Sequence, residues 1–425
     1  MKSRIIDIIN SMTILEKGWS FTFLLLSFFP ILPNAVRSIC MILLFVLSLR
    51  SNNGLIKHKI LILISAPFII YLFTGLLYPS INRALNFFVL LLPLIAIPFS
   101  YIRLEKAKLS MILRLSGLFF VLAILFMILI EAFFLMTHYD LLAEATNRTQ
   151  YSIKLRKLIE QPFDSHPTYQ GYFILLSLII LAMEFEKIKQ KLLRLIIAII
   201  SVLLVCFLFI ITSRIALISV TVFCLILLFK IKNYKTKRTI LACLLIIGML
   251  LTGFLSKPLK TRLVDFKFDN LQIPDDSISS SNNSISTRIA IWNCDVQIIR
   301  NNPMGIGIAH EKEALNNCVN AYNVSFLKDK FYNSHNQYLS YFICGGFIGF
   351  SAFLIFLLLL MRMARETKSW ALLTFVLITG IFMLTENILY RNDGLLAYSI
   401  MLCNIVFISK PAILSKKMDT NTELK

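Results

Sequence analysis

Acidic residues are scarce in this chain, which has 23 Asp and Glu against 43 Lys and Arg and a formal net charge of +20. The sequence also lacks a Cys-x-x-Cys pair and any His-Cys cluster at ligand spacing. We therefore expect no metal site and no cofactor. No Ala-x-Ala-like cleavage site follows the first apolar segment, which we expect to be a retained helix.

What the chain has in excess is apolar residues. They make up 57% of the sequence, with 35 Phe and a mean hydropathy of +0.77, which excludes an ordinary soluble globule. The basic residues recur in short clusters between apolar runs, a pattern that orients membrane helices, whereas a nucleic-acid binder would gather them on a polar domain. The composition predicts an all-α polytopic membrane protein. We expect membrane lipid, and no nucleic acid, among its partners.

The apolar runs predict about twelve transmembrane helices, with a long loop between the ninth and the tenth. The first two runs are short and form the least regular part of this count. The predicted spans are 18–33, 35–49, 60–78, 84–102, 109–137, 168–183, 192–212, 215–230, 239–256, 337–361, 369–389 and 395–409.

Loop charges predict the orientation of these helices. Alternate gaps are rich in Lys or Arg, and the short gaps between them carry single arginines, so the positive-inside rule puts both termini in the cytoplasm. Two longer segments, 137–167 and 256–334, then face the periplasm. We accordingly divide the chain into helices 1–9 at 1–255, with the loop at 137–167, a large periplasmic loop at 256–334, and helices 10–12 with a short cytoplasmic tail at 335–425.

The sequence NSHNQYLSYFICGGFIG, residues 333–349, places a His-Asn pair at the mouth of an apolar helix. Asn333 and Ser334 are good helix N-cap residues. The eleven-residue step from His335 to Gly346 returns to nearly the same helix face, and Gly349 lies one turn further. Small residues there would let another helix pack closely. The alternative is a capping histidine above an ordinary helix contact.

Two arginines stand out on the predicted outer side. Arg214, in the sequence ITSR, interrupts two apolar spans, and Arg288 precedes Trp292 by one helical turn in the long loop. A guanidinium at these places is suited to hold a phosphate group. The alternatives are an interfacial arginine that reaches out to water and a solvated helix face.

His-Asn, nine residues, then Gly-x-x-Gly is similar to a motif of the O-antigen ligase family, whose members transfer glycans from a polyprenyl diphosphate carrier. His335, Asn336, Gly346 and Gly349 fit this motif without a gap. The order of an arginine at a tight hairpin, Arg-Trp in the long loop, Pro-Met-Gly-Ile-Gly and Ser-His-Asn extends the resemblance over residues 214–394.

The resemblance implies that Arg214, Arg288 and His335 are catalytic. A histidine can be neutral near neutral pH and can accept the proton of an attacking sugar hydroxyl. The arginines would neutralise charge on the leaving diphosphate in place of a metal, for which the outer face offers no Asp-x-Asp motif.

Asn336 and Trp292, as members of the matching motifs, are expected to bind substrate. Glu386 and Arg391, in TENILYRNDG with Asp393, are candidates for orienting or binding groups, although structural ion pairing is an alternative. His166 is a further candidate for sugar or phosphate, against a plain loop histidine.

The resemblance implies an inner-membrane glycosyltransferase that moves a glycan from undecaprenyl diphosphate to a sugar hydroxyl of the lipid A core at the periplasmic face. The first alternative is an O-antigen polymerase with the same donor. A protein O-oligosaccharyltransferase fits less well, because we expect no large outer domain after the last helix. A lipid-linked glycan transporter would carry its ionisable residues near mid-membrane.

Cys294 and Cys318 are the two cysteines in a predicted outer loop, where the compartment is oxidising. We predict a disulfide between them that closes the Pro-Met-Gly-Ile-Gly region. The alternative is two free thiols.

Overall fold

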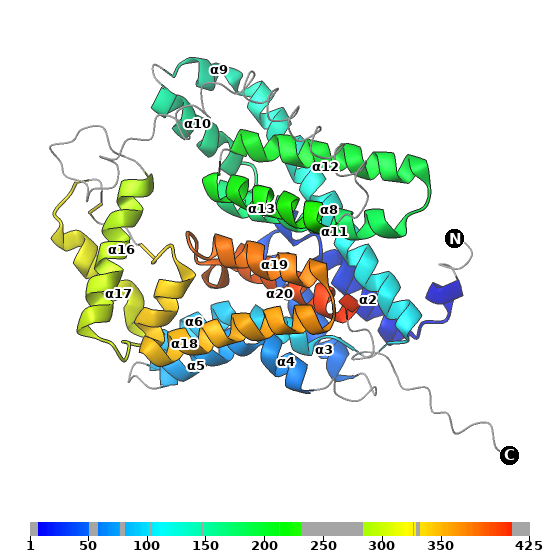
Figure 1. Cartoon of the computed structure of the whole chain (residues 1–425), viewed down its shortest axis with the longest axis horizontal. Coiled ribbons are helices and arrows are strands. Elements are labelled where there is room, and N and C mark those ends of the chain that lie inside the picture. The colour runs from blue at the N-terminus through cyan, green and yellow to red at the C-terminus, as the bar shows by residue number, and fades with distance from the viewer. Residues whose placement is uncertain are drawn as a thin grey trace.

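The computed structural model describes residues 7–50, 58–76, 81–102, 104–145, 148–211, 213–230, 284–325, 327–328 and 332–409. All regular elements within these ranges are helices (Figure 1). Their bounds are α2 Ile14–Leu26, η1 Phe29–Ile31, α3 Asn34–Leu49, α4 His58–Ile64, α5 Ala66–Leu76, α6 Ile81–Leu91, α7 Pro93–Phe99, α8 Lys106–Thr137, α9 Tyr139–Ala143, α10 Arg148–Glu160, α11 Pro167–Lys187, α12 Lys191–Ile211, α13 Arg214–Lys230, α16 Ser284–Asn301, α17 Ile308–Ala321, α18 Gln337–Glu366, α19 Trp370–Phe382, η4 Ile388–Tyr390 and α20 Asn392–Ser409.

The fold is that of a multi-pass membrane protein. Among the described residues, α8, α11, α12, α18 and α20 are each long and apolar enough to cross a bilayer. Every predicted span except 239–256, which lies outside the described residues, overlaps a helix, as does much of the loop predicted at 137–167. Residues 256–283 of the long loop also lie outside them. The structure therefore confirms the all-helical class but not the count of twelve.

Some predicted spans are broken into shorter helices. The run 60–78 forms α4 and α5, and the run 84–102 falls in α6 and α7. Pro67 and Pro93 stand at the starts of α5 and α7, where a missing backbone N–H costs no helical hydrogen bond. The prolines thus divide apolar segments that their composition alone predicts as single helices.

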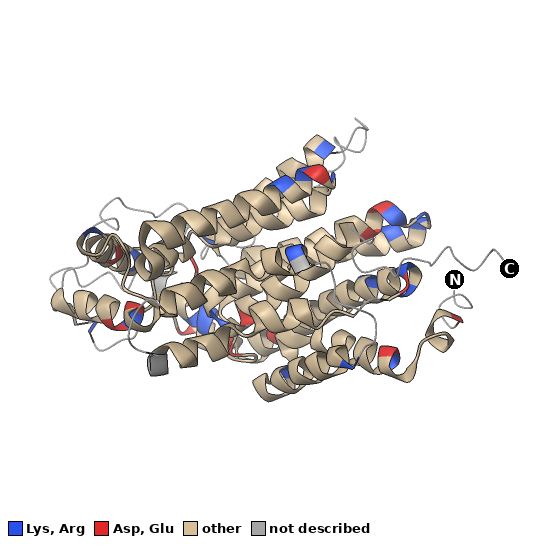
Figure 2. Cartoon of the chain, turned by 90° about the horizontal axis from the view of Figure 1, so that it is seen from below, with Lys and Arg blue, Asp and Glu red and all other residues tan. Residues whose placement is uncertain are grey.

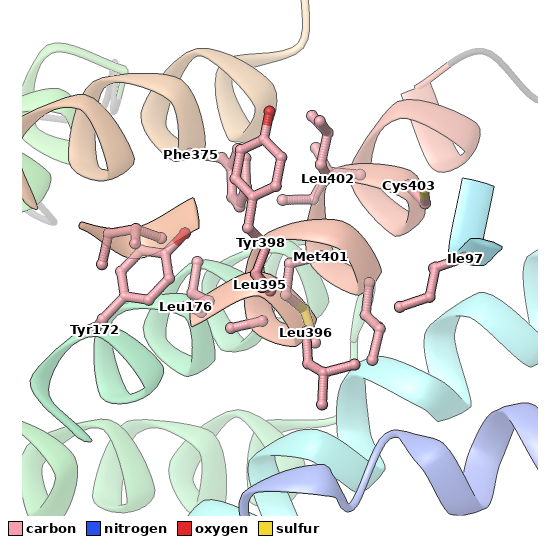
Figure 3. Close-up of a cluster of buried hydrophobic side chains, with 14 of the residues drawn as sticks. Ile97, Tyr172, Leu176, Phe375, Leu395, Leu396, Tyr398, Met401, Leu402 and Cys403 are labelled. Carbon is pink, nitrogen blue, oxygen red and sulfur yellow. The ribbon is translucent and has the colours of Figure 1, made fainter. Parts of the chain in front are cut away.

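The helices form layers around α11 and α20. In their most apolar stretches 83% of α11 and 78% of α20 are buried, against 33% of α8 and 28% of α12. Figure 3 shows Tyr172 of α11, Phe375 of α19 and Tyr398 of α20 in the central packing. The apolar outer surfaces of α8 and α12 therefore face the lipid, since side chains of this kind are not stable against water.

The two ends of the bundle differ in character. Many charged residues lie at the ends of helices, and a smaller number lie along the middle of the bundle (Figure 2). The pair α16 and α17 lies at the end opposite the turns that join α11 to α12 and α18 to α19 (Figure 1). Those turns carry the basic clusters that the charge pattern assigns to the cytoplasm.

Helix α18 is interrupted at Gly346, which has a φ of 59°. The turn that follows α16 docks at this kink. The N–H of Ile306 donates to the carbonyl of Ile343 at 2.8 Å, and the N–H of Phe347 donates to the carbonyl of Pro303 at 3.1 Å. A Cβ on Gly346 would lie 2.3 Å from the carbonyl carbon of Met304, so only glycine fits.

This arrangement corrects the expectation for the Gly-x-x-Gly pair. The predicted helix neighbour is present, because Thr74 of α5 contacts the sites of Gly345 and Gly349. The partner of Gly346, however, is a turn and not a helix. His335 and Gly346 do not share one continuous helix face, because α18 begins at Gln337 and is broken at Gly346.

The disulfide between Cys294 and Cys318 is present, with a Cα–Cα distance of 5.7 Å, and it confirms the prediction. It joins α16 to α17 on the buried side of α16, where Ala290, Ile291 and Ile298 also pack. Trp292 and Ile299 pack against the same cluster, whereas Val296 is 40% exposed.

Candidate active site

His335 lies in a short, tightly held segment between α17 and α18. Its φ is 46°, a left-handed conformation that is uncommon outside glycine. The backbone N–H of His335 donates to Oδ1 of Asn333 at 3.0 Å. Asn336, not Asn333 or Ser334, is the N-cap of α18, and its Oδ1 accepts from the N–H groups of Tyr338 and Leu339. Strain of this kind persists only where surrounding contacts hold it.

Helix α16 supplies many of those contacts. Arg288, Trp292 and Asp295 stand at intervals of four and three residues, so they lie along one face of the helix. Nε1 of Trp292 donates to the carbonyl of Ser334 at 3.0 Å, and the hydroxyl of Ser334 donates to Oδ2 of Asp295 at 2.7 Å. Trp292 and Asp295 thus both hydrogen-bond to Ser334, the residue before His335.

The segment after α19 completes the site. The predicted span 369–389 ends as a helix at Phe382, and turns follow it, in which the N–H of Glu386 donates to the carbonyl of Phe382 at 3.0 Å before the chain reaches η4. Gln337 joins this segment to α18, because its N–H donates to the carbonyl of Met383 at 2.8 Å and its Oε1 accepts from the N–H of Leu389 at 2.8 Å. Gln337 thus satisfies backbone groups that lie outside a helix.

This junction brings Glu386 against His335 and Arg288. Oε2 of Glu386 lies 3.3 Å from Nδ1 of His335, and Oε1 accepts from Nη2 of Arg288 at 2.5 Å. Glu386 is 2% exposed. Burial raises its pKa, but the hydrogen bond and charge of His335, together with the charge of Arg288, bring the pKa down to about 2. Glu386 is therefore an ionised acceptor between two donors.

A second group of donors comes from α10 and the start of α11. Nδ1 of His166, the N-cap of α11, accepts from the N–H of Thr168 at 3.3 Å. Nη2 of Arg156 lies 3.1 Å from Nε2 of the same imidazole. Burial lowers the pKa of His166 to about 3, and Arg156, Arg391 and Arg288 lower it against the opposing effect of Glu386. His166 is therefore neutral.

The remaining arginines approach the same place. Arg214 begins α13 directly after the short α12–α13 turn, as predicted, and lies close enough to Arg288 for their like charges to repel. Arg391 lies over the ring of Tyr169, 5.8 Å from its centre, and its charge acts on His166. Residues from five separate parts of the chain thus contribute to one site.

The structure places the predicted site residues in different ways. His335, Arg288 and Glu386 make direct contact, while His166 acts electrostatically on Glu386, Arg214 on Arg288, and Arg391 on His166. Oδ1 of Asn336 and Nε1 of Trp292 bind backbone groups, so these two side chains hold the segment in place. The expected ion pairing among Glu386, Arg391 and Asp393 is wrong for Asp393, because that carboxylate pairs with Arg37 at 2.5 Å.

Arg156 and Asp295 were missed by the sequence reasoning. Arg156 is one of several basic residues on an amphipathic segment, and only its burial beside His166 distinguishes it. Asp295 follows Cys294 in the segment where the sequence singled out Arg288, Trp292 and Cys294. A carboxyl three residues after Trp292, on the face that carries Arg288, is the signal that could have identified it.

Part of the chain is similar to a known protein family. Residues 199–354, a little over a third of the chain, match the family model described as O-Antigen ligase. The matched region contains Arg214, Arg288, His335 and both glycines of the Gly-x-x-Gly pair. No curated protein and no solved structure matches the chain.

Proposed function

We propose that this protein joins a lipid-linked glycan to the lipid A core, because residues 199–354 match the model of the O-antigen ligase family, a family of ligase- and polymerase-type glycosyltransferases. The donor is a glycan on undecaprenyl diphosphate, and the acceptor is a sugar hydroxyl. The reaction takes place at the periplasmic face of the bacterial inner membrane. The observation that carries the proposal is the contact of His335 and Arg288 with one buried carboxylate, Glu386.

This contact supports His335 as the general base. An ionised carboxylate only accepts hydrogen bonds, so Glu386 holds the imidazole proton on Nδ1 and leaves the lone pair of Nε2 for the acceptor hydroxyl. As the sugar oxygen attacks the anomeric carbon, its proton passes to Nε2 of His335. The negative charge of Glu386 then stabilises the imidazolium that forms.

The arginines act on the other side of the reaction. The bond between the anomeric carbon and the diphosphate oxygen breaks, and the electron pair leaves with the lipid diphosphate. Arg288 retains a buried Nε that makes no hydrogen bond within the described residues, so it has a donor to offer a phosphate oxygen while Nη2 contacts Glu386. Arg214 adds a second guanidinium, and the pair offsets the charge that develops on the leaving group.

The location of the site supports an enzyme over a transporter. Arg288 of α16 contacts Glu386, which also contacts His335, so the site lies at the α16–α17 end of the bundle, opposite the basic turns (Figure 1). A transporter would be expected to place its ionisable binding groups near the middle of the membrane. A glycan that is joined to a membrane-anchored acceptor needs a site at the membrane surface.

The alternative function within the same family is O-antigen polymerisation, which hands the growing glycan to another carrier-linked repeat. Deletion of the gene separates the two. Loss of a ligase leaves polymerised glycan on the lipid carrier and a bare lipid A core. Loss of a polymerase leaves cores capped with a single repeat, and electrophoresis of lipopolysaccharide that shows this single-repeat band would refute the ligase assignment.

A further inference from the structure

The imidazole of His166 is in contact with two donors. Nδ1 faces the N–H of Thr168 at 3.3 Å, and Nε2 faces Nη2 of Arg156 at 3.1 Å. A neutral imidazole has one N–H and one lone pair, and a guanidinium has no acceptor. Whichever nitrogen of His166 carries the proton, one N–H therefore points at another N–H. A shared acceptor would relieve this conflict.

The charge around the pair favours an anion as that acceptor. Arg156, Arg288 and Arg391 each act electrostatically on His166, and Arg288 repels Arg156. Glu386 and Glu160 offset only part of this positive charge. Like charges held together in a partly buried site are costly, and a bound anion would repay the cost.

Arg288 lies near two different arginines. It repels Arg214 of α13 and Arg156 of α10, so the three guanidinium groups are supplied by three separate helices with Arg288 common to both pairs. A diphosphate has two phosphoryl groups joined by one oxygen. A site with two arginine pairs that share one member is suited to hold both groups at once.

We propose that Arg156 and His166 form a second phosphoryl subsite, which binds one phosphoryl group of the donor diphosphate while Arg214 and Arg288 bind the other. Arg156 gives a charged donor and His166 gives the ring N–H that now has no acceptor. This inference rests on the proposed function for the identity of the donor. It predicts that the protein distinguishes a prenyl diphosphate from a prenyl monophosphate without any glycan transfer.

The test is a binding measurement on the purified full chain in detergent. The probes are farnesyl diphosphate and farnesyl monophosphate, which share one lipid tail and differ by a single phosphoryl group. The wild-type protein should prefer the diphosphate by about tenfold or more, the size expected for charge-assisted hydrogen bonds. Arg156→Ala should lose most of this preference and keep its affinity for the monophosphate within about twofold, as expected if only one subsite is lost.

Two further variants separate binding from folding. His166→Asn keeps an oxygen that can cap α11 but loses the ring N–H, so it should also reduce the diphosphate preference. Lys154→Ala removes a positive charge from the same helix at an exposed ion pair with Glu144 and should leave the preference unchanged. Retained monophosphate binding shows that each variant is folded.

The outcomes are distinct. An unchanged diphosphate preference in Arg156→Ala would overturn the inference, as would an equal loss for both probes. A variant that binds the diphosphate normally but has a raised KM for phosphorylated lipid A core would assign the anion to the acceptor and also overturn it. If the wild-type protein shows the preference but transfers no glycan to lipid A core, the proposed function fails and the phosphoryl subsite stands.

Discussion

Glu386→Gln is the substitution that tests the coupling between His335 and Arg288. Glutamine has nearly the same shape but no negative charge, so it removes the electrostatic contribution with little change in packing. A fall in the pKa of Glu386 from 4.5 to about 2 corresponds to about 3 kcal/mol in favour of the ionised carboxylate, even after the cost of burial. This free energy comes from the interaction of the Glu386 carboxylate with the His335 imidazolium and the Arg288 guanidinium.

If most of this interaction is used when His335 becomes charged, the turnover rate of Glu386→Gln should fall by about a hundredfold. The assay is single-turnover glycan transfer by purified protein with saturating donor, which isolates the chemical step from binding. Glu144→Gln, which neutralises an exposed carboxylate paired with Lys154, is the matched control and should be fully active. A turnover rate of Glu386→Gln within about threefold of wild type would refute the argument. It would mean that the negative charge of Glu386 does not stabilise the charged His335 during the reaction.

Stability should fall on acidification between about pH 4.5 and 2, because the folded pKa of Glu386 lies below its unfolded value, and thermal unfolding of Glu386→Gln should lack this part of the loss. Cys294→Ser opens a disulfide that closes 24 residues and should lower the unfolding free energy by about 3 kcal/mol in chemical denaturation under oxidising conditions. Gly346→Ala should reduce both folded yield and transfer, because a Cβ there meets Met304, whereas Gly18→Ala, where a Cβ meets nothing closer than 3.8 Å, should be tolerated. Arg288→Lys should restore little of the transfer lost in Arg288→Ala, since lysine cannot contact Glu386 and a phosphate with one planar group.

Sequence patterns predicted those features that depend on local composition or on a motif. The apolar runs predicted most described helices, the outer-loop cysteines predicted the Cys294–Cys318 bond, and the family resemblance brought Arg288 and His335 together. Glu386 was identified as a candidate, but its contact with both residues depends on the break after Phe382 and on Gln337, which joins two segments far apart in sequence. Hydropathy averaged over the segment does not predict such a break, because the polar residues 385–387 lie between apolar residues on both sides.

The roles of the glycines and of Arg156 also could not be predicted from the sequence. A Gly-x-x-Gly pair in an apolar helix is typical of helix packing, and nothing local indicates that Gly346 has a positive φ and receives the turn after α16. Arg156 lies among other basic residues of α10, and its contact with His166 arises only when α10 folds back against α11. Both features are tertiary, so a single sequence does not contain a signal for them.

The central claim is that His335 removes the proton of the acceptor hydroxyl while arginines hold the donor. The most direct measurement compares wild type and His335→Ala in transfer of glycan from undecaprenyl diphosphate to lipid A core, with purified protein and a chelator present, together with donor binding. We predict transfer by wild type, none detectable by His335→Ala, and donor affinities of the two proteins within about threefold, because the base acts on the acceptor. Normal transfer by His335→Ala, or a strict need for an added divalent cation, would contradict the mechanism.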